Sequence, residues 1–402
     1  MTGMGVVAPN GSGQQEFWES QVAGRSGIRK LTRFDATLHN VRIAGEALIP
    51  ESLADPQMDL TRTDRCTQLA AAAAKMAIVD GGLDGFDLSD AGIVSGTGWG
   101  CVESLEGSHR NFVTDGPEAV QARFAPMAMN NNTPAWLAIR YGFGGPATVT
   151  TSACCSAADA LIVAHQMISS GEADLVMAGG AEAPLTPHIV AGFDRLGVLS
   201  RDNDIPEQAC RPFRATRTGM VLAEGAAYLI LESASHAAAR GRAPVAKFAG
   251  YGRSSDAHHM LRLHPDAAGA ERAIRSALRS AGLRPDEVGY VNAHGTGTAG
   301  NDAHEALALR KVFADRATRP AIAGIKSLTG HTLGAAGAIE AVATIQAIAH
   351  GTIPLSAGAG PLDAALDIDV VLGEPRNVDL RAALSNSFGF GGHNCVLAFT
   401  RP

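Results

Sequence analysis

The sequence predicts an α/β fold built from two similar halves, and three observations support this prediction. Short β-branched apolar runs, typical of buried strands, alternate with Ala- and Leu-rich runs that are typical of buried helices. Glycine-rich turns stand between them, and 46 of the 402 residues are glycine. The same order of elements recurs after about 245 residues. This pattern indicates a mostly parallel sheet in each half, with residues 1–245 forming one half and 246–402 the other.

The composition is that of a globular protein. Of all residues, 46% are apolar and 18% are charged, which excludes a disordered chain. The net charge of −7 contains no long basic run, so we expect no nucleic-acid partner. No apolar run reaches the ~18 residues of a membrane-spanning helix, and the start does not resemble a signal peptide. The Ala-rich run 334–349 is interrupted by Glu340. We therefore expect no membrane partner.

The six cysteines show neither a metal-binding nor a disulfide pattern. None forms a CxxC pair or a Cys/His cluster with zinc spacing. A chain of this size needs no disulfides for stability, so we expect reduced thiols, a cytoplasmic location and no metal site.

The elements of the first half follow from the positions of apolar runs and glycines. The expected ranges are a strand entering a glycine loop at 2–9, helix 17–22, helix 62–80, strand 91–100, strand 147–151, helix 156–169, strand 173–179 and strand 221–232. Gly81 and Gly82 end the helix over 62–80. Residues 233–246 form the break before the second half.

The second half begins at residues 249–256, whose glycine pattern repeats that of residues 2–9. The ranges expected after it are helix 269–282, strand 288–293, strand 320–325, helix 334–349 and a strand–loop–strand unit over 382–400.

Cys154 lies at the turn between the strand 147–151, expected to be buried, and the helix 156–169. The first N–H groups of a helix have no partner within the helix. The position is therefore expected to lower the pKa of the thiol and to hold an oxyanion. The alternative is that Cys154 is a small buried apolar residue, as most free cysteines are.

Three further glycine-rich segments carry polar side chains at the ends of predicted strands. They are NAHGTGT over 292–298, KSLTGH over 326–331 and NSFGFGGHN over 386–394. A lone histidine is more often structural than catalytic. A cysteine at a helix start together with His294 and His331, all after strands, predicts a cluster beyond the carboxyl ends of the sheets.

Six motifs occur in one order along the chain. They are TGMGVVAPNG, SACCSA, GGAEA, HGTGT, KSLTGH and GFGGHN. In these motifs and their order, over essentially its whole length, the chain resembles elongating β-ketoacyl-acyl carrier protein synthases of the thiolase superfamily. The resemblance implies the five-layer αβαβα thiolase fold from two pseudo-duplicated halves, an active site where the halves meet, and dimerisation through a large interface.

The resemblance also implies roles for particular residues. Cys154 is expected to be the nucleophile, and its backbone N–H shares an oxyanion hole with that of Phe390, the gating aromatic residue. His294 and His331 occupy the two catalytic histidine positions. The other positions carried over are Lys326 with Glu305 as its carboxylate partner, Thr296 and Thr298 for the pantetheine arm, and Phe388 and Trp99 in the acyl pocket.

These residue types suit a decarboxylative Claisen condensation. A thiolate accepts the acyl group, and loss of CO2 from a malonyl thioester leaves an enolate oxygen that two neutral Nε2–H donors can hold. By the resemblance, the substrates arrive on the phosphopantetheine of an acyl carrier protein (ACP), and no other cofactor is implied.

Three alternatives share this fold. A chain-length-factor-like partner subunit of a polyketide synthase lacks the nucleophile, whereas this chain has Cys154. A thiolase needs a second catalytic cysteine, whereas Cys395 lies in an apolar strand. An initiating synthase pairs its cysteine with His and Asn, whereas HGTGT and TGH supply two histidines here. The pathway stays open between fatty-acid elongation by a homodimer and polyketide synthesis by half of a heterodimer.

Three features are particular to this chain. Residues 214–218 replace an acidic pattern of the family, which puts the usual ion pairs there in doubt. Arg62 and Arg65 are candidates for docking an acidic carrier protein. Trp99 either fills the far end of the acyl pocket, restricting it to short or compact acyl groups, or turns outward into the dimer interface.

Overall fold

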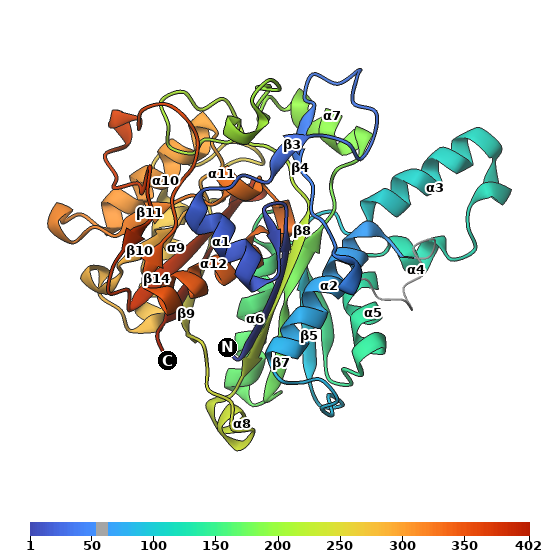
Figure 1. The fold of residues 1–402 in the computed structure, drawn as a ribbon, viewed down its shortest axis with the longest axis horizontal. Coiled ribbons are helices and arrows are strands. Elements are labelled where there is room, and N and C mark those ends of the chain that lie inside the picture. Colours follow the sequence, from blue (N-terminus) through green and yellow to red (C-terminus); the bar gives the residue numbers. More distant parts are fainter. Residues whose placement is uncertain (54–62) are drawn as a thin grey trace.

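The computed structural model describes residues 1–53 and 63–402, whose strands form two large mixed sheets (Figure 1). The first sheet has the order β2-β1-β8-β7-β5-β6, and the second has the order β11-β10-β14-β15-β9. The strands of the first sheet are β1 (Gly3–Ala8), β2 (Gly11–Ser12), β5 (Gly92–Gly96), β6 (Ala147–Thr150), β7 (Leu175–Glu182) and β8 (Gly225–Glu232). Those of the second are β9 (Lys247–Ser255), β10 (Tyr290–Asn292), β11 (Ala321–Ala323), β14 (Ala382–Gly389) and β15 (His393–Thr400).

Helices cover both sheets and fill the space between them. Helices α2 (Arg65–Asp80) and α5 (Asn132–Tyr141) cover the outer face of the first sheet, and α9 (Ala268–Ala281) and α10 (Ala299–Val312) cover that of the second. Helices α6 (Ser156–Ser170) and α12 (Ala336–His350) lie between the sheets. The predicted α/β fold with five layers, αβαβα, is confirmed.

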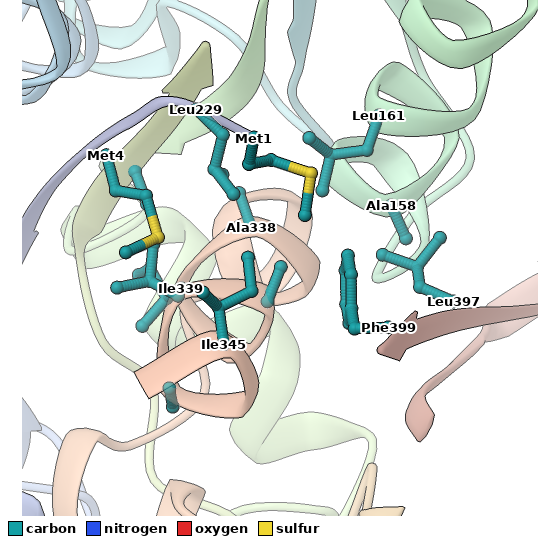
Figure 2. Packing of buried hydrophobic residues seen from close by; sticks show 14 of the residues in the cluster. Met1, Met4, Ala158, Leu161, Leu229, Ala338, Ile339, Ile345, Leu397 and Phe399 are labelled. Atoms are coloured by element: carbon teal, nitrogen blue, oxygen red, sulfur yellow. The ribbon is translucent and has the colours of Figure 1, made fainter. Parts of the chain in front are cut away.

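The central layer is packed with buried apolar side chains of both sheets and of the two helices between them (Figure 2). Ala158 and Leu161 of α6 and Ile339 of α12 belong to one buried cluster with residues of both sheets. A Cβ at Gly337 would lie only 2.8 Å from the Cβ of Ala158, so the two central helices meet where one of them has no side chain. This close approach explains the Ala- and Gly-rich sequence of 334–349.

The expectation of mostly parallel sheets is wrong, because both sheets are mixed. In the first, β8 lies antiparallel to both β1 and β7. In the second, β15 lies antiparallel to both β14 and β9. Successive strands become parallel only through a long crossover connection, which is usually a helix. Strands β14 and β15 are instead joined by the tight turn at Phe390–Gly392, and a long irregular segment precedes β8.

Strand β6, expected to be buried, is the edge strand of the first sheet and is largely exposed. Its apolar sequence matched the pattern of a central strand, but the chain offers it only one neighbour, β5.

The remaining elements are short or peripheral. They are α1 (Gln14–Ala23), α3 (Val102–Asp115), α4 (Phe124–Ala128), α7 (Pro187–Arg195), α8 (Ala234–Ala239), α11 (Lys326–Thr329), β3 (Ile28–Lys30), β4 (Ile43–Gly45), β12 (Thr352–Ile353) and β13 (Arg376–Asn377). Helix α3 extends from one side of the molecule (Figure 1).

Among the described residues, only Leu333–His350 is long and apolar enough to cross a membrane. Within the fold, 89% of this stretch is buried. Its composition is therefore explained by its place as the central helix of the core.

Candidate active site

A cavity of about 760 Å³ contains the predicted cluster. The first half contributes Cys154, Phe193 and Met220 to its wall, and the second half contributes the two histidines and the start of α10. The predicted site residues that line it are Cys154, His294, Thr296, Thr298, His331, Phe388 and Phe390. The site thus lies where the two halves meet.

Cys154 is presented by a strained turn between β6 and α6. The preceding residue, Ala153, has a φ of 52°, in the left-handed region that favours glycine. Ser156 fixes this turn, because its Oγ accepts from the N–H of Ser152 at 2.9 Å and donates to the carbonyl of Ala153 at 2.7 Å. The Sγ of the next residue, Cys155, donates to the carbonyl of Ser387 at 3.1 Å, which ties the helix start to β14.

The predicted lowering of the Cys154 thiol pKa is wrong. Burial raises the pKa of Cys154 to about 12, against the opposing effect of the Lys326 charge. Helix α6 begins at Ser156 with Cys155 as its cap, so Cys154 lies before the helix terminus. The thiol is therefore neutral in the resting protein, and a thiolate needs stabilisation from a neighbouring donor.

His331 is that neighbour. Its Nε2 lies 3.1 Å from the Sγ of Cys154. The N–H of Leu333 donates to its Nδ1 at 3.2 Å, so Nδ1 carries no proton and Nε2 must carry it. Burial, followed by the Lys326 charge, holds the pKa of His331 well below its usual range. His331 is thus a neutral Nε2–H donor directed at the sulfur.

His294 is held in the same tautomer. The Nζ of Lys326 donates to its Nδ1 at 3.3 Å, which leaves the proton on Nε2. Burial, then the charge of Lys326, also holds the pKa of His294 well below its usual range. The two imidazole rings are 5.3 Å apart and nearly perpendicular. The pair therefore presents two neutral N–H donors to one region of the cavity.

The predicted pairing of Lys326 with Glu305 is wrong, because the carboxylate partner of Lys326 is Glu340. The Lys326 ammonium, 1% exposed, donates to Glu340, to Nδ1 of His294 and to the carbonyl of His294, so all three of its N–H bonds are used. Glu305 instead accepts from the N–H groups of His294 and Gly295. Glu305 therefore shapes the HGT turn. The sequence signal for the pairing with Lys326 is Glu340 itself, because a charged residue within a buried apolar helix indicates an ion pair.

We expect Lys326→Ala to lower the free energy of unfolding by about 3 kcal/mol, because it leaves the Glu340 carboxylate buried without its cation. Urea denaturation measures this loss, which protonation of Glu340 limits, because burial raises the pKa of this carboxyl to about 7 even beside Lys326. The double variant Lys326→Met/Glu340→Leu should recover most of it. Arg376→Met, which breaks an exposed pair with Asp369, is the matched control and should cost less than about 1 kcal/mol. An equal loss in the single and double variants would contradict this account.

The GFGG turn packs directly against the nucleophile. A Cβ at Gly389 would lie 3.3 Å from the backbone N of Cys154, so a side chain there would crowd this amide. The ring of Phe390 stacks on Phe193 with 6.3 Å between centroids, at the cavity wall. Phe388 is buried, with its ring 6.0 Å from that of His294. Glycine at 389 thus brings the two turns into contact.

Thr296 and Thr298 line the same cavity, with 2.9 Å between their hydroxyl oxygens. Thr298 also caps α10, because its Oγ1 accepts from the N–H of Asn301. Their hydroxyl groups are therefore fixed at the start of this helix.

Two expectations based on single residues do not hold within one chain. Trp99 is 48% exposed and is not part of the cavity wall, which contradicts its placement in the acyl pocket and agrees with the outward orientation. Arg65 is paired with buried Glu224 at 2.7 Å, so it is not a free docking cation. Arg62 lies outside the described residues.

In segment 214–218, Arg217 pairs with Asp363 at 2.8 Å, so an ion pair is present despite the missing acidic pattern.

The Cys154 sulfur and one nitrogen of each histidine lie within 4.8 Å of one another, a spacing that a metal ion can bridge. Both nitrogens of each ring are already committed, however, since Nε2 carries the proton and Nδ1 accepts from Leu333 or Lys326. The arrangement therefore suits a negatively charged oxygen or sulfur rather than a cation.

Comparison with known proteins agrees with this geometry. The family model described as "Beta-ketoacyl synthase, N-terminal domain" matches residues 1–237, and "Beta-ketoacyl synthase, C-terminal domain" matches residues 245–359. The chain is 37% identical to 3-oxoacyl-[acyl-carrier-protein] synthase 2 of Staphylococcus aureus (strain N315), over 100% of this chain and 97% of the relative.

Two solved structures are also similar. The ishigamide ketosynthase/chain length factor has a TM-score of 0.94 at 34% identity, covering 100% of this chain and 98% of the other. A type II polyketide ketosynthase in complex with its acyl carrier protein, AntDE:AntF, has a TM-score of 0.89 at 30% identity, with the same coverage of both chains.

Proposed function

Because the chain belongs to the β-ketoacyl synthase family, we propose that it joins an acyl group bound to Cys154 to a malonyl group, with loss of CO2. Both groups are delivered as thioesters of an acyl carrier protein, and the product is a 3-oxoacyl thioester. The observation that carries this proposal is the pair of neutral Nε2–H donors that line one cavity with the Cys154 sulfur.

In the first half-reaction the sulfur of Cys154 attacks the acyl thioester carbonyl. The Nε2–H of His331, 3.1 Å away, stabilises negative charge on the sulfur. The backbone N–H groups of Cys154 and Phe390 hold the oxyanion of the tetrahedral intermediate. The C–S bond to the carrier breaks, and the proton of the Cys154 thiol ends on the carrier thiol.

In the second half-reaction the malonyl thioester loses its carboxylate as CO2, and the electron pair of the broken C–C bond forms an enolate. The Nε2–H donors of His294 and His331 hold the enolate oxygen, each typically lowering the barrier by roughly 3 kcal/mol. The enolate carbon then attacks the acyl carbonyl on Cys154, the C–S bond breaks, and the Cys154 thiolate takes up a proton from water to restore the thiol.

The other residues position these groups or the substrate. Lys326 holds His294 in its tautomer, Glu305 shapes the HGT turn, and Phe390 gates the cavity. Thr296 and Thr298 bind the pantetheine arm. Phe388 forms part of the cavity wall.

Intact mass spectrometry tests this proposal. The protein is incubated with acyl carrier proteins that bear acyl groups of two to sixteen carbons, with and without malonyl carrier protein. We expect the mass of the chain to rise by one acyl group, and the adduct to disappear with release of a 3-oxoacyl carrier when malonyl carrier is added. No adduct with any acyl group would overturn the proposal.

A chain-length-factor-like subunit without activity is the second candidate, since one similar structure contains such a factor by name. The complete set of Cys154, His294 and His331 favours the active subunit. The mass experiment separates the two, because a silent subunit gains no acyl group. The set of acyl groups that load Cys154 in this panel also indicates whether the protein serves a fatty-acid or a polyketide pathway.

We propose that the chain dimerises, in the cytoplasm, through the exposed edge of the first sheet. Strand β6 has an unpaired edge, and an exposed edge of this kind pairs readily with another chain. Helix α5 contacts β6, and large apolar side chains are exposed on α5 and along the segment between β5 and α5. They are Trp99, Leu105, Phe112, Val113, Met129 and Ile139.

We expect light scattering to give twice the 41.4 kDa of one chain, and Ile139→Glu together with Val113→Glu to shift it to the monomer. These two side chains are 86% and 69% exposed in the single chain, so the substitutions should leave the fold intact. Leu38→Glu, at a position in a turn that is 97% exposed, is the control and should stay dimeric. A wild-type monomer would indicate that a different subunit covers this face.

A further inference from the structure

His304 is a buried histidine in the cavity wall to which the proposed reaction gives no role. It lies on α10, is 6% exposed and lines the same cavity as Cys154. Neither ring nitrogen has a hydrogen-bond partner among the residues that the structure describes. Burying a polar group without a partner is unfavourable, so an unpaired imidazole in a cavity wall requires an explanation.

Packing alone does not explain it. The ring of His304 meets the ring of Phe388 edge-on, with 6.2 Å between centroids. A leucine or a phenylalanine would make this contact without burying two nitrogens. The other residues of α10 that line the cavity mostly have no polar side-chain atoms. They are Ala299, Gly300, Ala303 and Leu307.

The charged and polar neighbours of His304 are occupied elsewhere. The carboxylate of Asp256 accepts from Asn394 at 2.8 Å and from the N–H of His264. The Nδ1 of His264 accepts from the N–H of Asp266. Burial lowers the pKa of His304, so the ring is neutral at physiological pH and offers one donor and one acceptor.

His304 is close enough to the reacting groups to contact a bound substrate. The Phe388 ring stands 6.2 Å from His304 and 6.0 Å from His294, which limits the separation of the two histidine rings to about 12 Å. The polar groups nearest a thioester are the amide groups of the carrier arm on one side and, in a 3-oxoacyl chain, the ketone on the other. Both present a carbonyl oxygen.

We infer that His304 donates a hydrogen bond to a carbonyl oxygen of the bound substrate and thereby selects substrates that carry this oxygen. The inference rests on the proposed function, because it takes the cavity to be the substrate site. The apolar side chains of Met260, Leu261 and Leu263 line the same cavity and would hold the hydrocarbon part of the same ligand.

The test compares His304→Leu with His304→Gln, whose amide can still donate a hydrogen bond. Rates of Cys154 acylation are measured by intact mass for saturated and 3-oxoacyl groups of equal length, each as the pantetheine thioester and as the ethyl thioester. We expect His304→Leu to lower kcat/KM about tenfold for substrates that carry the contacted oxygen, and His304→Gln to recover most of this loss.

The two sources of the oxygen give different patterns. A loss confined to 3-oxoacyl groups, on either thiol, assigns the oxygen to the acyl chain. A loss confined to pantetheine thioesters, with either acyl group, assigns it to the carrier arm. His350→Leu removes an exposed histidine that stacks on Trp18 outside this cavity, and it is the matched control.

An equal loss on all four substrates, or no loss on any of them, would overturn the inference. Thermal denaturation identifies a variant that fails to fold. If His304→Leu fails to fold, His304→Gln alone tests the inference, through the ratio of its acylation rates on substrates with and without the contacted oxygen. Wild-type protein that is not acylated by any substrate would instead overturn the proposed function.

Discussion

Cys154→Ala is expected to abolish acyl loading, by roughly 10⁴-fold or more, while the protein folds normally. Among the described residues, Cys154 is the only cysteine that lines the cavity, and alanine fits the small buried volume without a clash. The turn that presents residue 154 is held by Ser152 and Ser156 through their own hydrogen bonds, so it does not depend on the thiol. Intact mass after incubation with acyl carrier protein measures the loading, and circular dichroism checks the fold.

Cys155→Ala is the matched control, since it removes the adjacent thiol. Its sulfur points away from the cavity and donates to the carbonyl of Ser387, so we expect loading to continue with a small loss of stability. The Cys154→Ala variant keeps both histidines and should still release CO2 from malonyl carrier protein. An acyl adduct at another residue of this variant would show that the nucleophile lies elsewhere.

Much of the architecture was predictable because it depends on local patterns. The buried strands and central helices show apolar runs bounded by glycine, and these features survive in the folded chain. The order of the motifs also predicts that Cys154, His294 and His331 share one site. Their proximity follows from topology, since each lies at a turn after a strand of one of the two sheets.

What the sequence did not predict depends on long-range packing. The pairing of Lys326 with Glu340 rather than Glu305 is decided by which face of α12 meets the KSLTGH turn. The high pKa of the Cys154 thiol arises from desolvation by both halves, which no local pattern contains.

The edge position of β6 was missed for a related reason. An apolar sequence has the same appearance whether a strand is covered by its own chain or by another one. Trp99 is exposed on the surface of the same sheet region, and the sequence alone does not predict its exposure for the same reason.

His294→Ala and His331→Ala are expected to separate the two half-reactions. His331 contacts the Cys154 sulfur at 3.1 Å and also faces the proposed enolate, so its loss should slow acyl transfer and malonyl decarboxylation alike. His294 is held by Lys326 and makes no hydrogen bond to that sulfur, so its loss should slow decarboxylation by roughly 10²- to 10³-fold and acyl transfer only a few-fold. Release of labelled CO2 from malonyl carrier protein reports one step, and the rate of the acyl-mass shift reports the other.

The reason for this difference lies in the tautomers. Both imidazoles carry their proton on Nε2, because the N–H of Leu333 donates to Nδ1 of His331 and the ammonium of Lys326 donates to Nδ1 of His294. Neither ring can accept the Cys154 proton at Nε2, so each ring acts only as a hydrogen-bond donor to negative charge. The rate that falls when a ring is removed therefore depends on which negatively charged atom that ring contacts. His294→Gln should then recover part of the decarboxylation rate, because an amide N–H can replace the donor. Equal losses in both half-reactions for both alanine variants would contradict this division and would indicate that the two rings act as one unit.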